Sequence, residues 1–209
     1  MFITFEGPDG SGKTTVLQKL LPILQSKTKS KIFLSREPGG NNISEAIRKI
    51  ILNDSNNKMD VRTEILLYAA SRSQHVVENI LPHLNNNDIV ISDRFIDSSV
   101  VYQGIARNFD ENIVLKINSF ATNGLLPDLT LYLDIPPLLG LQRIKKTRNK
   151  LDRLEKENIL FHENVRKGYL KLLKDNPERI MKINATKPLN LVVNDCLNII
   201  IKKFPTYFK

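Results

Sequence analysis

The stretch GPDGSGKT at residues 7–14 decides the fold of this chain. It matches the pattern Gly-x4-Gly-Lys-Ser/Thr, which is typical of a loop that binds phosphate. An apolar run at residues 1–5 precedes it and an amphipathic run at residues 14–25 follows it, so the loop joins a predicted strand to a predicted helix. A glycine-rich hairpin turn is the alternative, and the strand–helix context argues against it. The sequence therefore predicts a P-loop.

The residue types of this loop suit nucleoside triphosphate chemistry. Its glycines allow the backbone to turn successive N–H groups toward phosphate oxygens. Lys13 would reach the β- and γ-phosphates, and Thr14 would offer its hydroxyl to Mg²⁺. Asp93, at the end of an apolar run, is the candidate second metal ligand, although such an aspartate is often only a turn or cap residue. The predicted ATP-binding residues of the loop are Gly7, Pro8, Asp9, Gly10, Ser11, Gly12, Lys13, Thr14 and Thr15.

Widely spaced strands predict the architecture around the loop. After the first strand, β-patterned runs occur at residues 31–35, 88–92, 129–134 and 179–184. Helical periodicity occurs at residues 43–52, 61–84, 112–122, 138–146 and 154–174. Such spacing favours a parallel sheet with helices on both faces. We therefore expect a three-layer α/β P-loop NTPase fold with a five-stranded parallel sheet, formed as a single domain over residues 1–209.

Composition excludes some classes of protein and leaves the partner open. The chain has 209 residues, of which 41% are hydrophobic and 25% charged, as in a globular protein and unlike a disordered or fibrous one. No apolar run approaches the roughly 18 residues that a membrane span needs, so we expect an intracellular protein. The net charge of +9 is compatible with nucleic acid, an acidic membrane surface or a polyanionic small substrate.

Six motifs along the chain narrow the function. They read REPGG at residues 36–40, LYAASR at 67–72, DRFIDSS at 93–99, YQG at 102–104, LDIP at 133–136 and DRLE at 152–155. In this order they resemble the thymidylate kinase family, of the bacterial type with arginines in a lid. The resemblance implies ATP-dependent phosphorylation of dTMP to dTDP, which feeds dTTP synthesis, with Mg²⁺ as cofactor. Because members of this family are commonly homodimers, we expect a homodimer. No nucleic-acid-binding motif or membrane span is visible in the sequence, so we expect a cytoplasmic protein that binds neither nucleic acid nor a membrane.

The same resemblance assigns the acceptor site. Arg94 and Arg36 would hold the phosphate of dTMP, because a guanidinium fork suits phosphate oxygens, with Arg48 as a weaker third candidate. Arg72 and Gln103 would hydrogen-bond the edge of thymine. An aromatic ring at position 68 would stack on the base; family members usually carry Phe, and this chain has Tyr68. The predicted dTMP-binding residues are Asp9, Arg36, Pro38, Arg48, Tyr68, Arg72, Arg94, Ser98, Ser99, Tyr102 and Gln103.

A charged segment at residues 143–157 resembles the family's mobile lid. The variable P-loop positions carry no basic residue, so the cation over the transferred phosphoryl group is expected from this lid, with Arg148 and Arg153 favoured over Lys150. Arg143 resembles the residue that stacks on adenine. A solvated helix held by pairs such as Arg153 with Glu157 is the alternative. The predicted catalytic residues are Lys13, Arg94, Arg148, Arg153 and Asp9.

Two other functions remain as alternatives. Another nucleoside or nucleotide kinase would share the architecture, and the pair Arg72 and Gln103 argues against it. A P-loop ATPase switch would suit the basic charge, yet it needs neither a lid arginine cluster nor a second phosphate site at Arg36 and Arg94. The sequence does not determine turnover or strictness toward uridine monophosphate analogues.

Overall fold

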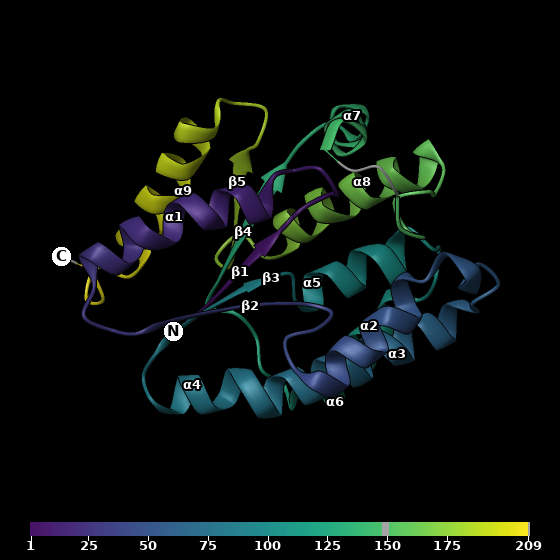
Figure 1. Cartoon of the computed structure of the whole chain (residues 1–209), viewed down its shortest axis with the longest axis horizontal. Coiled ribbons are helices and arrows are strands. Elements are labelled where there is room, and N and C mark those ends of the chain that lie inside the picture. The colour runs from purple at the N-terminus through teal and green to yellow at the C-terminus, as the bar shows by residue number, and fades with distance from the viewer. Residues whose placement is uncertain (148–150, 209) are drawn as a thin grey trace.

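A five-stranded parallel sheet forms the centre of the molecule (Figure 1). The computed structural model of the chain describes residues 1–147 and 151–208. The strands lie in the order β2-β3-β1-β4-β5. Their bounds are Phe2–Glu6 (β1), Ile32–Arg36 (β2), Ile89–Asp93 (β3), Leu129–Asp134 (β4) and Ile180–Asn184 (β5). The predicted fold class is therefore confirmed, with strand bounds within one residue of those expected.

Burial explains why the central strands read as almost continuous apolar runs. All residues of β1 and β4 are buried, because helices cover both faces of a parallel sheet. The edge strand β2 is only partly buried and alternates in exposure. The carboxyl ends of β1 and β3 lie side by side, since Phe5 pairs with Asp93. The loops that follow these two strands therefore start next to each other, and the site is built there.

The helices divide between the two faces of the sheet. The bounds are Lys13–Lys27 (α1), Asn42–Leu52 (α2), Val61–His75 (α3), Leu81–Asn85 (α4), Ile96–Ser99 (α5), Glu111–Thr122 (α6), Pro137–Thr147 (α7), Ile159–Asp175 (α8) and Leu189–Lys203 (α9). Short 3-10 and π turns are η1 (Asp54–Asn56), η2 (Val76–Ile80) and η3 (Val100–Ile105). Helices α1 and α9 pack on one face around Phe5 and Leu131, whereas α3, η3 and α8 pack on the other around Tyr132 (Figure 1).

One expected helix begins later than predicted, one matches its predicted bounds to within one residue but contains a π turn, and two helical segments were not predicted. The helix expected at 154–174 begins only at Ile159, because Asn158 caps it by accepting a hydrogen bond from the Phe161 N–H. The helix expected at 61–84 continues from α3 through the π turn η2 into α4. Sequence periodicity missed α5 with η3, whose residues are buried almost all round, and it also missed α9. A helix without a polar face gives no amphipathic signal, which explains the first of these omissions.

Candidate active site

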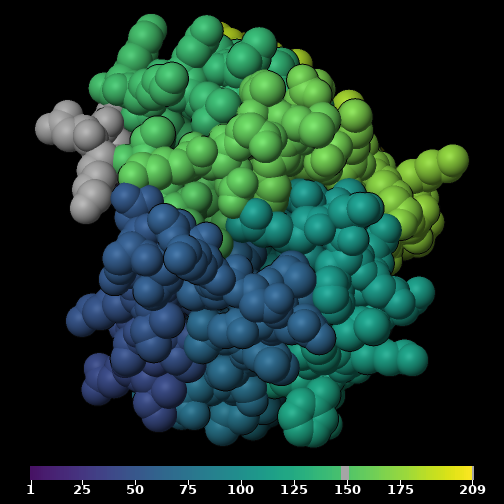
Figure 2. Space-filling model, turned by 90° about the vertical axis from the view of Figure 1, so that its right-hand side faces the viewer, coloured from purple at the N-terminus to yellow at the C-terminus, as the bar shows by residue number. Residues whose placement is uncertain are grey.

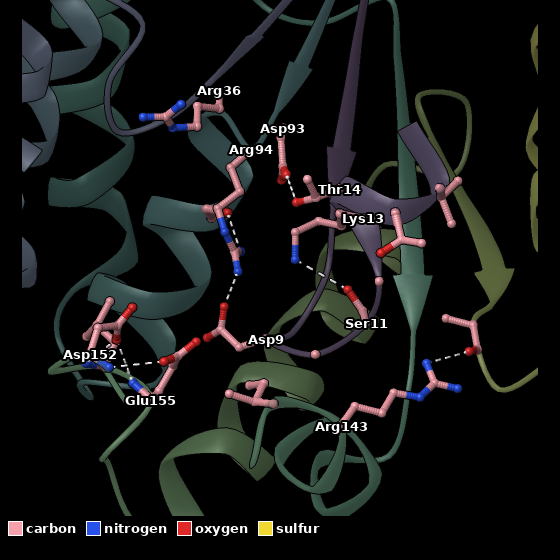
Figure 3. A pocket seen from close by; sticks show the side chains of 18 of the residues that line it. Asp9, Ser11, Lys13, Thr14, Arg36, Asp93, Arg94, Arg143, Asp152 and Glu155 are labelled. Atoms are coloured by element: carbon pink, nitrogen blue, oxygen red, sulfur yellow. Dashed lines mark hydrogen bonds and ion pairs between the residues drawn. The ribbon is translucent and has the colours of Figure 1, made fainter. Parts of the chain in front are cut away.

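The P-loop lies between β1 and α1 and needs glycine for steric reasons (Figure 3). Gly10 has a φ of 74°, and a Cβ there would lie 2.1 Å from the carbonyl oxygen of Gly140. Gly7 has a φ of 144°, and its Cβ would lie 2.5 Å from the carbonyl oxygen of Leu133. A side chain at either position would therefore push the loop away from β4 and α7. Helix α1 begins at Lys13 without a side-chain cap from the described residues, which leaves its first N–H groups available for an anion.

Lys13 folds back over this loop. Its Nζ donates to the carbonyl oxygens of Gly7 at 3.0 Å and Pro8 at 3.2 Å, and to Ser11 Oγ at 3.3 Å. Burial lowers the pKa of Lys13 to about 8, and the charge of Arg94 acts in the same direction. The ammonium group is thus held inside the loop, where a bound triphosphate would place its own negative charge.

Thr14 and Asp93 form an oxygen pair at the start of α1. Thr14 Oγ1 donates to Asp93 Oδ2 at 3.1 Å, across the neighbouring ends of β1 and β3 (Figure 3). Hard oxygen ligands suit Mg²⁺, which commonly takes only one or two protein ligands and completes its shell with phosphate oxygens and water. The described residues contain no group of three or more His, Cys, Asp or Glu side chains placed to hold a metal. The pair therefore fits a metal that arrives with a nucleotide and does not fit a metal held by protein alone.

Arg94 lies opposite the P-loop in a strained backbone position. Its φ of 75° is unusual for a residue with a side chain. Its guanidinium donates to Asp9 Oδ1 at 2.5 Å, to the Gly7 carbonyl oxygen at 3.1 Å, and to the hydroxyls of Ser98 and Tyr102 at 3.1 and 3.2 Å. Burial alone would lower the pKa of Arg94, but Tyr102 and Asp9 outweigh it and raise that pKa. Arg94 is therefore a fixed cation close to the P-loop backbone.

Asp9 connects the P-loop with this cation. Burial alone would raise its pKa, but the charges of Arg94 and Lys13 hold the pKa of Asp9 below its usual range. The Tyr102 hydroxyl donates to Asp9 Oδ2 at 3.0 Å, so both carboxylate oxygens are engaged. Asp9 thus remains ionised at neutral pH and orients Arg94 and Tyr102 together.

Glu6 lies beneath these groups and was not singled out from the sequence. Its carboxylate accepts from the N–H groups of Phe95 at 2.7 Å and Ser98 at 3.3 Å, and from the Tyr169 hydroxyl at 2.7 Å. Burial raises the pKa of Glu6 to about 7, and the nearby charge of Asp97 adds to the increase. Its position gave a signal that was available from the sequence: a carboxylate ends an otherwise uncharged strand directly before the P-loop. Glu6 holds the start of α5 in place, and with it Arg94.

One cavity joins the P-loop to the residues around Arg94. Its volume is about 600 Å³. The predicted residues that line it are Asp9, Gly10, Ser11, Gly12, Lys13, Thr14, Thr15, Arg36, Pro38, Arg48, Tyr68, Asp93, Arg94, Ser98, Tyr102, Gln103 and Arg143. Figure 3 shows Lys13 and Arg94 on facing sides of this space, with Arg36 farther along the same side as Arg94. The structure thus gathers most of the predicted nucleotide-binding residues around one space.

The two weaker arginine candidates lie at the outer part of this cavity. Arg36 donates to Glu45 Oε1 at 2.7 Å and is half-exposed. Arg48 donates to the carbonyl oxygen of Pro38 at 2.8 Å. Tyr68 lines the same space and also packs against the core around Ile65, so core packing and contact with a ligand are compatible at this position.

Arg72 and Ser99 lie behind the cavity wall and do not line it. The Arg72 guanidinium donates to Glu37 Oε2 at 2.6 Å, to Ser99 Oγ at 2.8 Å and to the Phe95 carbonyl oxygen at 3.1 Å, and it also contacts Asn118. In this arrangement Arg72 supports the wall that carries Arg94. Its predicted contact with a base, and that of Ser99 with the acceptor, remain predictions.

The lid segment is described only in part. Arg148 and Lys150 lie outside the described residues, so their predicted roles remain predictions. Arg153 is buried and does not line the cavity; it donates to Glu64 Oε2 at 2.6 Å and to the Ile51 carbonyl oxygen at 2.9 Å. Glu157 pairs with Arg107 at 2.6 Å, a different partner from the one suggested by the sequence. The catalytic role of Arg153 remains a prediction, and in this arrangement it joins residues 151–157 to α3.

The far end of the cavity was only partly foreseen. Arg143 lines it and donates to the carbonyl oxygen of Ala185 at 3.1 Å. Ala185 and Lys187, from the connection between β5 and α9, and Leu189 and Val192, from the start of α9, also line this end, and sequence reasoning missed them. Their residue types are common and carry no motif. Only the order of the strands places them next to the P-loop.

Comparisons with known proteins agree with this geometry. The family model described as thymidylate kinase matches residues 5–196. Thymidylate kinase from Lacticaseibacillus casei is 54% identical over 209 residues, which cover 99% of this chain and 98% of that protein. Thymidylate kinase from Enterococcus faecalis is 50% identical over 209 residues, with 100% and 99% covered.

A solved structure extends the agreement to three dimensions. The crystal structure of thymidylate kinase from Ehrlichia chaffeensis matches with a TM-score of 0.78 and 31% identity, covering 96% of this chain and 97% of that one. The family model spans both walls of the cavity, since its match includes the P-loop, Arg94 and Gln103. The chain belongs to the thymidylate kinase family.

Proposed function

We propose that this chain transfers the γ-phosphoryl group of ATP to the phosphate of dTMP, giving ADP and dTDP. The observation that carries the proposal is that one cavity of about 600 Å³ has a P-loop on one wall and Arg94, Arg36 and Arg48 on the other. Two anion sites that face each other suit a reaction between two phosphorylated substrates. The product would feed dTTP synthesis. No described helix is long and apolar enough to cross a membrane, and we propose a cytoplasmic location.

On the donor side, the P-loop backbone and Lys13 would bind the β- and γ-phosphates of ATP. Lys13 Nζ would exchange its contacts with the loop carbonyls for phosphate oxygens, a short movement since it already lies within the loop. Thr14 and Asp93 would hold Mg²⁺, which supplies charge neutralisation between the β- and γ-phosphates when bound. The adenine would lie at the end of the cavity near Arg143 and Leu189.

On the acceptor side, Arg94 would bind the phosphate of dTMP. Asp9 and the Gly7 carbonyl oxygen hold the guanidinium in place, so binding costs little side-chain entropy. The attacking phosphate oxygen is already negatively charged, and no strong base is needed. Catalysis then consists mainly of alignment and charge neutralisation.

The base and sugar would lie between Tyr68 and Gln103, both on the cavity wall. Tyr68 would stack on thymine, and Gln103 would hydrogen-bond its edge, with Arg72 behind. Tyr102 would lie near the 2′ position, where its bulk disfavours a ribonucleotide. The cation that covers the transferred group would come from the lid at residues 143–157, with Arg148 as the candidate. We place all of these parts within one domain over residues 1–209.

We also propose that the chain forms a homodimer through α3 and α6. The two helices pack side by side, and their outer surface carries large apolar residues, including Leu66, Ile113 and Phe120, of which Phe120 is 91% exposed. Burying such a surface is favourable because it removes apolar area from water. Light scattering at assay concentration should give twice the mass of the chain, and the mass of one chain would overturn this part of the proposal.

The test of the main proposal is an ADP-release assay with ATP, Mg²⁺ and one nucleoside monophosphate at a time. We expect dTMP to stimulate ADP release strongly and other monophosphates weakly. Stimulation by a different acceptor alone would show that the base assignment is wrong. ADP release that is independent of any monophosphate would favour an ATPase switch, for which the arginine-lined acceptor wall has no use.

A further inference from the structure

Glu64 is a buried carboxylate that accepts hydrogen bonds from three directions. It lies on α3 with 1% of its surface exposed. Its Oε1 accepts from Gln103 Nε2 at 2.9 Å. Its Oε2 accepts from Arg153 Nη2 at 2.6 Å and from Arg107 Nη2 at 3.3 Å. Neither the sequence motifs nor the proposed mechanism uses this residue.

The chemistry of a carboxylate determines which way the Gln103 amide points. An ionised carboxylate only accepts hydrogen bonds, so the amide must present its NH₂ group to Glu64. The Gln103 carbonyl oxygen, Oε1, then points away from Glu64. In the described part of the molecule, the buried side-chain polar atoms without a partner are Ser71 Oγ and His162 Nε2. Gln103 Oε1 is not among them and receives no hydrogen bond from a described residue, so it is open to the cavity that Gln103 lines.

The surroundings of Glu64 keep its oxygens in place. Arg153 is also bound to the Ile51 carbonyl oxygen at 2.9 Å, and Arg107 is also paired with Glu157 at 2.6 Å. Figure 2 shows the green residues that precede and form α8 packed directly against the blue residues of α2 and α3. The guanidinium groups of Arg107 and Arg153 are therefore fixed in place. Any side chain at position 64 must present a hydrogen-bond acceptor to them.

We propose that Glu64 is a positioning residue that determines base specificity by holding the Gln103 carbonyl oxygen toward the acceptor base. A carbonyl oxygen accepts from the N3–H of thymine, whereas the N3 of cytosine has no hydrogen to donate. The inference rests on the proposed function, because it assumes that the base of the acceptor lies beside Gln103. It assigns the choice between these bases to a residue outside the cavity wall.

The substitution Glu64→Gln gives a directional test. The two arginines would take the carbonyl oxygen of the introduced glutamine, so its NH₂ group would face Gln103 and turn the Gln103 amide over. An N–H group would then point into the cavity, which suits cytosine and opposes thymine. We expect the ratio of kcat/KM for dTMP to that for dCMP to fall by at least about tenfold, and more if the buried site strongly penalises unpaired polar groups. The KM for ATP should stay unchanged.

Two further variants separate this role from simple structural support. Glu64→Asp keeps a negative charge beside Arg107 and Arg153, but its shorter side chain moves the carboxylate oxygen away from Gln103. We therefore expect a smaller fall in the same ratio. This variant also allows the proposal to be tested if Glu64→Gln does not fold. Glu157→Gln is the matched control, since it removes a carboxylate from Arg107 without touching Gln103. Its ratio should equal that of the unchanged chain.

A double substitution completes the experiment. In a Gln103→Leu background, Glu64→Gln should cause no further change in the ratio, because the group through which it acts is gone. Equal losses toward dTMP and dCMP in the single variants, or a ratio that still shifts in the Gln103→Leu background, would overturn the proposal. If the proposed function itself is wrong, the unchanged chain will not phosphorylate dTMP at all, which distinguishes that result from failure of the inference about Glu64.

Discussion

The two walls of the cavity are built in different ways. The donor wall comes mainly from consecutive residues, 9–16, and it presents backbone N–H groups at the start of α1. The acceptor wall comes from β2, α2, α3, η3 and the residue after β3, and it presents side chains. One wall is therefore a local structure that needs glycine. The other exists only when distant segments are folded together.

The difference extends to how charge is held. Lys13 is buried among loop carbonyls, and its pKa is lowered, so burying its positive charge reduces the stability of the folded state. On the acceptor wall, Arg94 and Arg36 are instead paired with carboxylates, those of Asp9 and Glu45. We therefore expect removal of the Lys13 charge to affect activity alone, whereas removal of a paired arginine from the acceptor wall should affect activity and folding together.

The largest effect should come from Lys13→Ala. Removing a preorganised cation from the transferred phosphates should lower kcat by about 10³-fold, near 4 kcal/mol. The free energy of unfolding should not fall, because the variant no longer buries a charge. Steady-state kinetics and urea unfolding measure the two quantities. Lys19→Ala, at an exposed position on the same helix, is the control and should change neither. Lower stability of the Lys13 variant would contradict the contrast between the walls.

Arg94→Ala should have the next largest effect. It removes the fixed guanidinium that would bind the acceptor phosphate, and we expect kcat/KM for dTMP to fall by about 10²-fold, near 3 kcal/mol. Asp9 would also lose its ion-pair partner, so stability should decrease as well. Arg62→Ala, an exposed position on α3, provides a comparison with the same change in charge. Near-normal rates in the Arg94 variant would remove Arg94 from the site.

The same contrast explains what the sequence alone could predict. The P-loop, the strands and the motif residues Arg94 and Gln103 were accessible, because each lies in a short pattern with its own chemistry. All five strands were expected, since buried parallel strands read as apolar runs. Short local patterns in the sequence are therefore largely sufficient to predict the fold and the donor wall.

The other features of the site could be identified only from the three-dimensional structure. Glu37 holds Arg72 behind the wall, and Glu64 holds Arg153 against α3. Each glutamate is distant in sequence from its arginine and belongs to no charge pattern. The cavity residues near Leu189 have ordinary types, and only the neighbouring positions of β1, β4 and β5 bring them to the P-loop. Sequence motifs named the acceptor residues but could not say which of them face the cavity.

Glu37→Gln tests how far the acceptor wall depends on buried charge. Glu37 Oε2 accepts from Arg72 at 2.6 Å, and Oε1 lies 2.9 Å from His75 Nδ1, with all three side chains buried. Glutamine keeps one acceptor and leaves the Arg72 charge without a counterion, so we expect a loss of about 2 kcal/mol in the free energy of unfolding. Chemical denaturation measures it. Glu111→Gln, in the exposed pair with Lys171, should cost under about 1 kcal/mol. Equal losses in both variants would contradict the importance of burial here.

The smallest effect expected, taken over one pH unit, is a dependence on pH that has opposite signs for activity and stability. Because the pKa of Lys13 is lowered to about 8, the free protein loses this charge above that pH. The kcat/KM for ATP should then fall by about tenfold per pH unit above it, since this parameter reports the free enzyme. An unfolded chain keeps the proton until about pH 10.4.

Stability should move the other way over the same range of pH. Between the two pKa values the unfolded state binds more protons than the folded state, so the contribution of Lys13 to stability rises with pH by about 1.4 kcal/mol per unit. Unfolding curves at several pH values measure this slope against that of Lys13→Ala, in which it should vanish. If stability has the same pH slope in the two proteins, or if kcat/KM for ATP stays level above about pH 9, then the folded loop does not lower the pKa of Lys13. The donor wall would then lose the feature that distinguishes it from the paired arginines across the cavity.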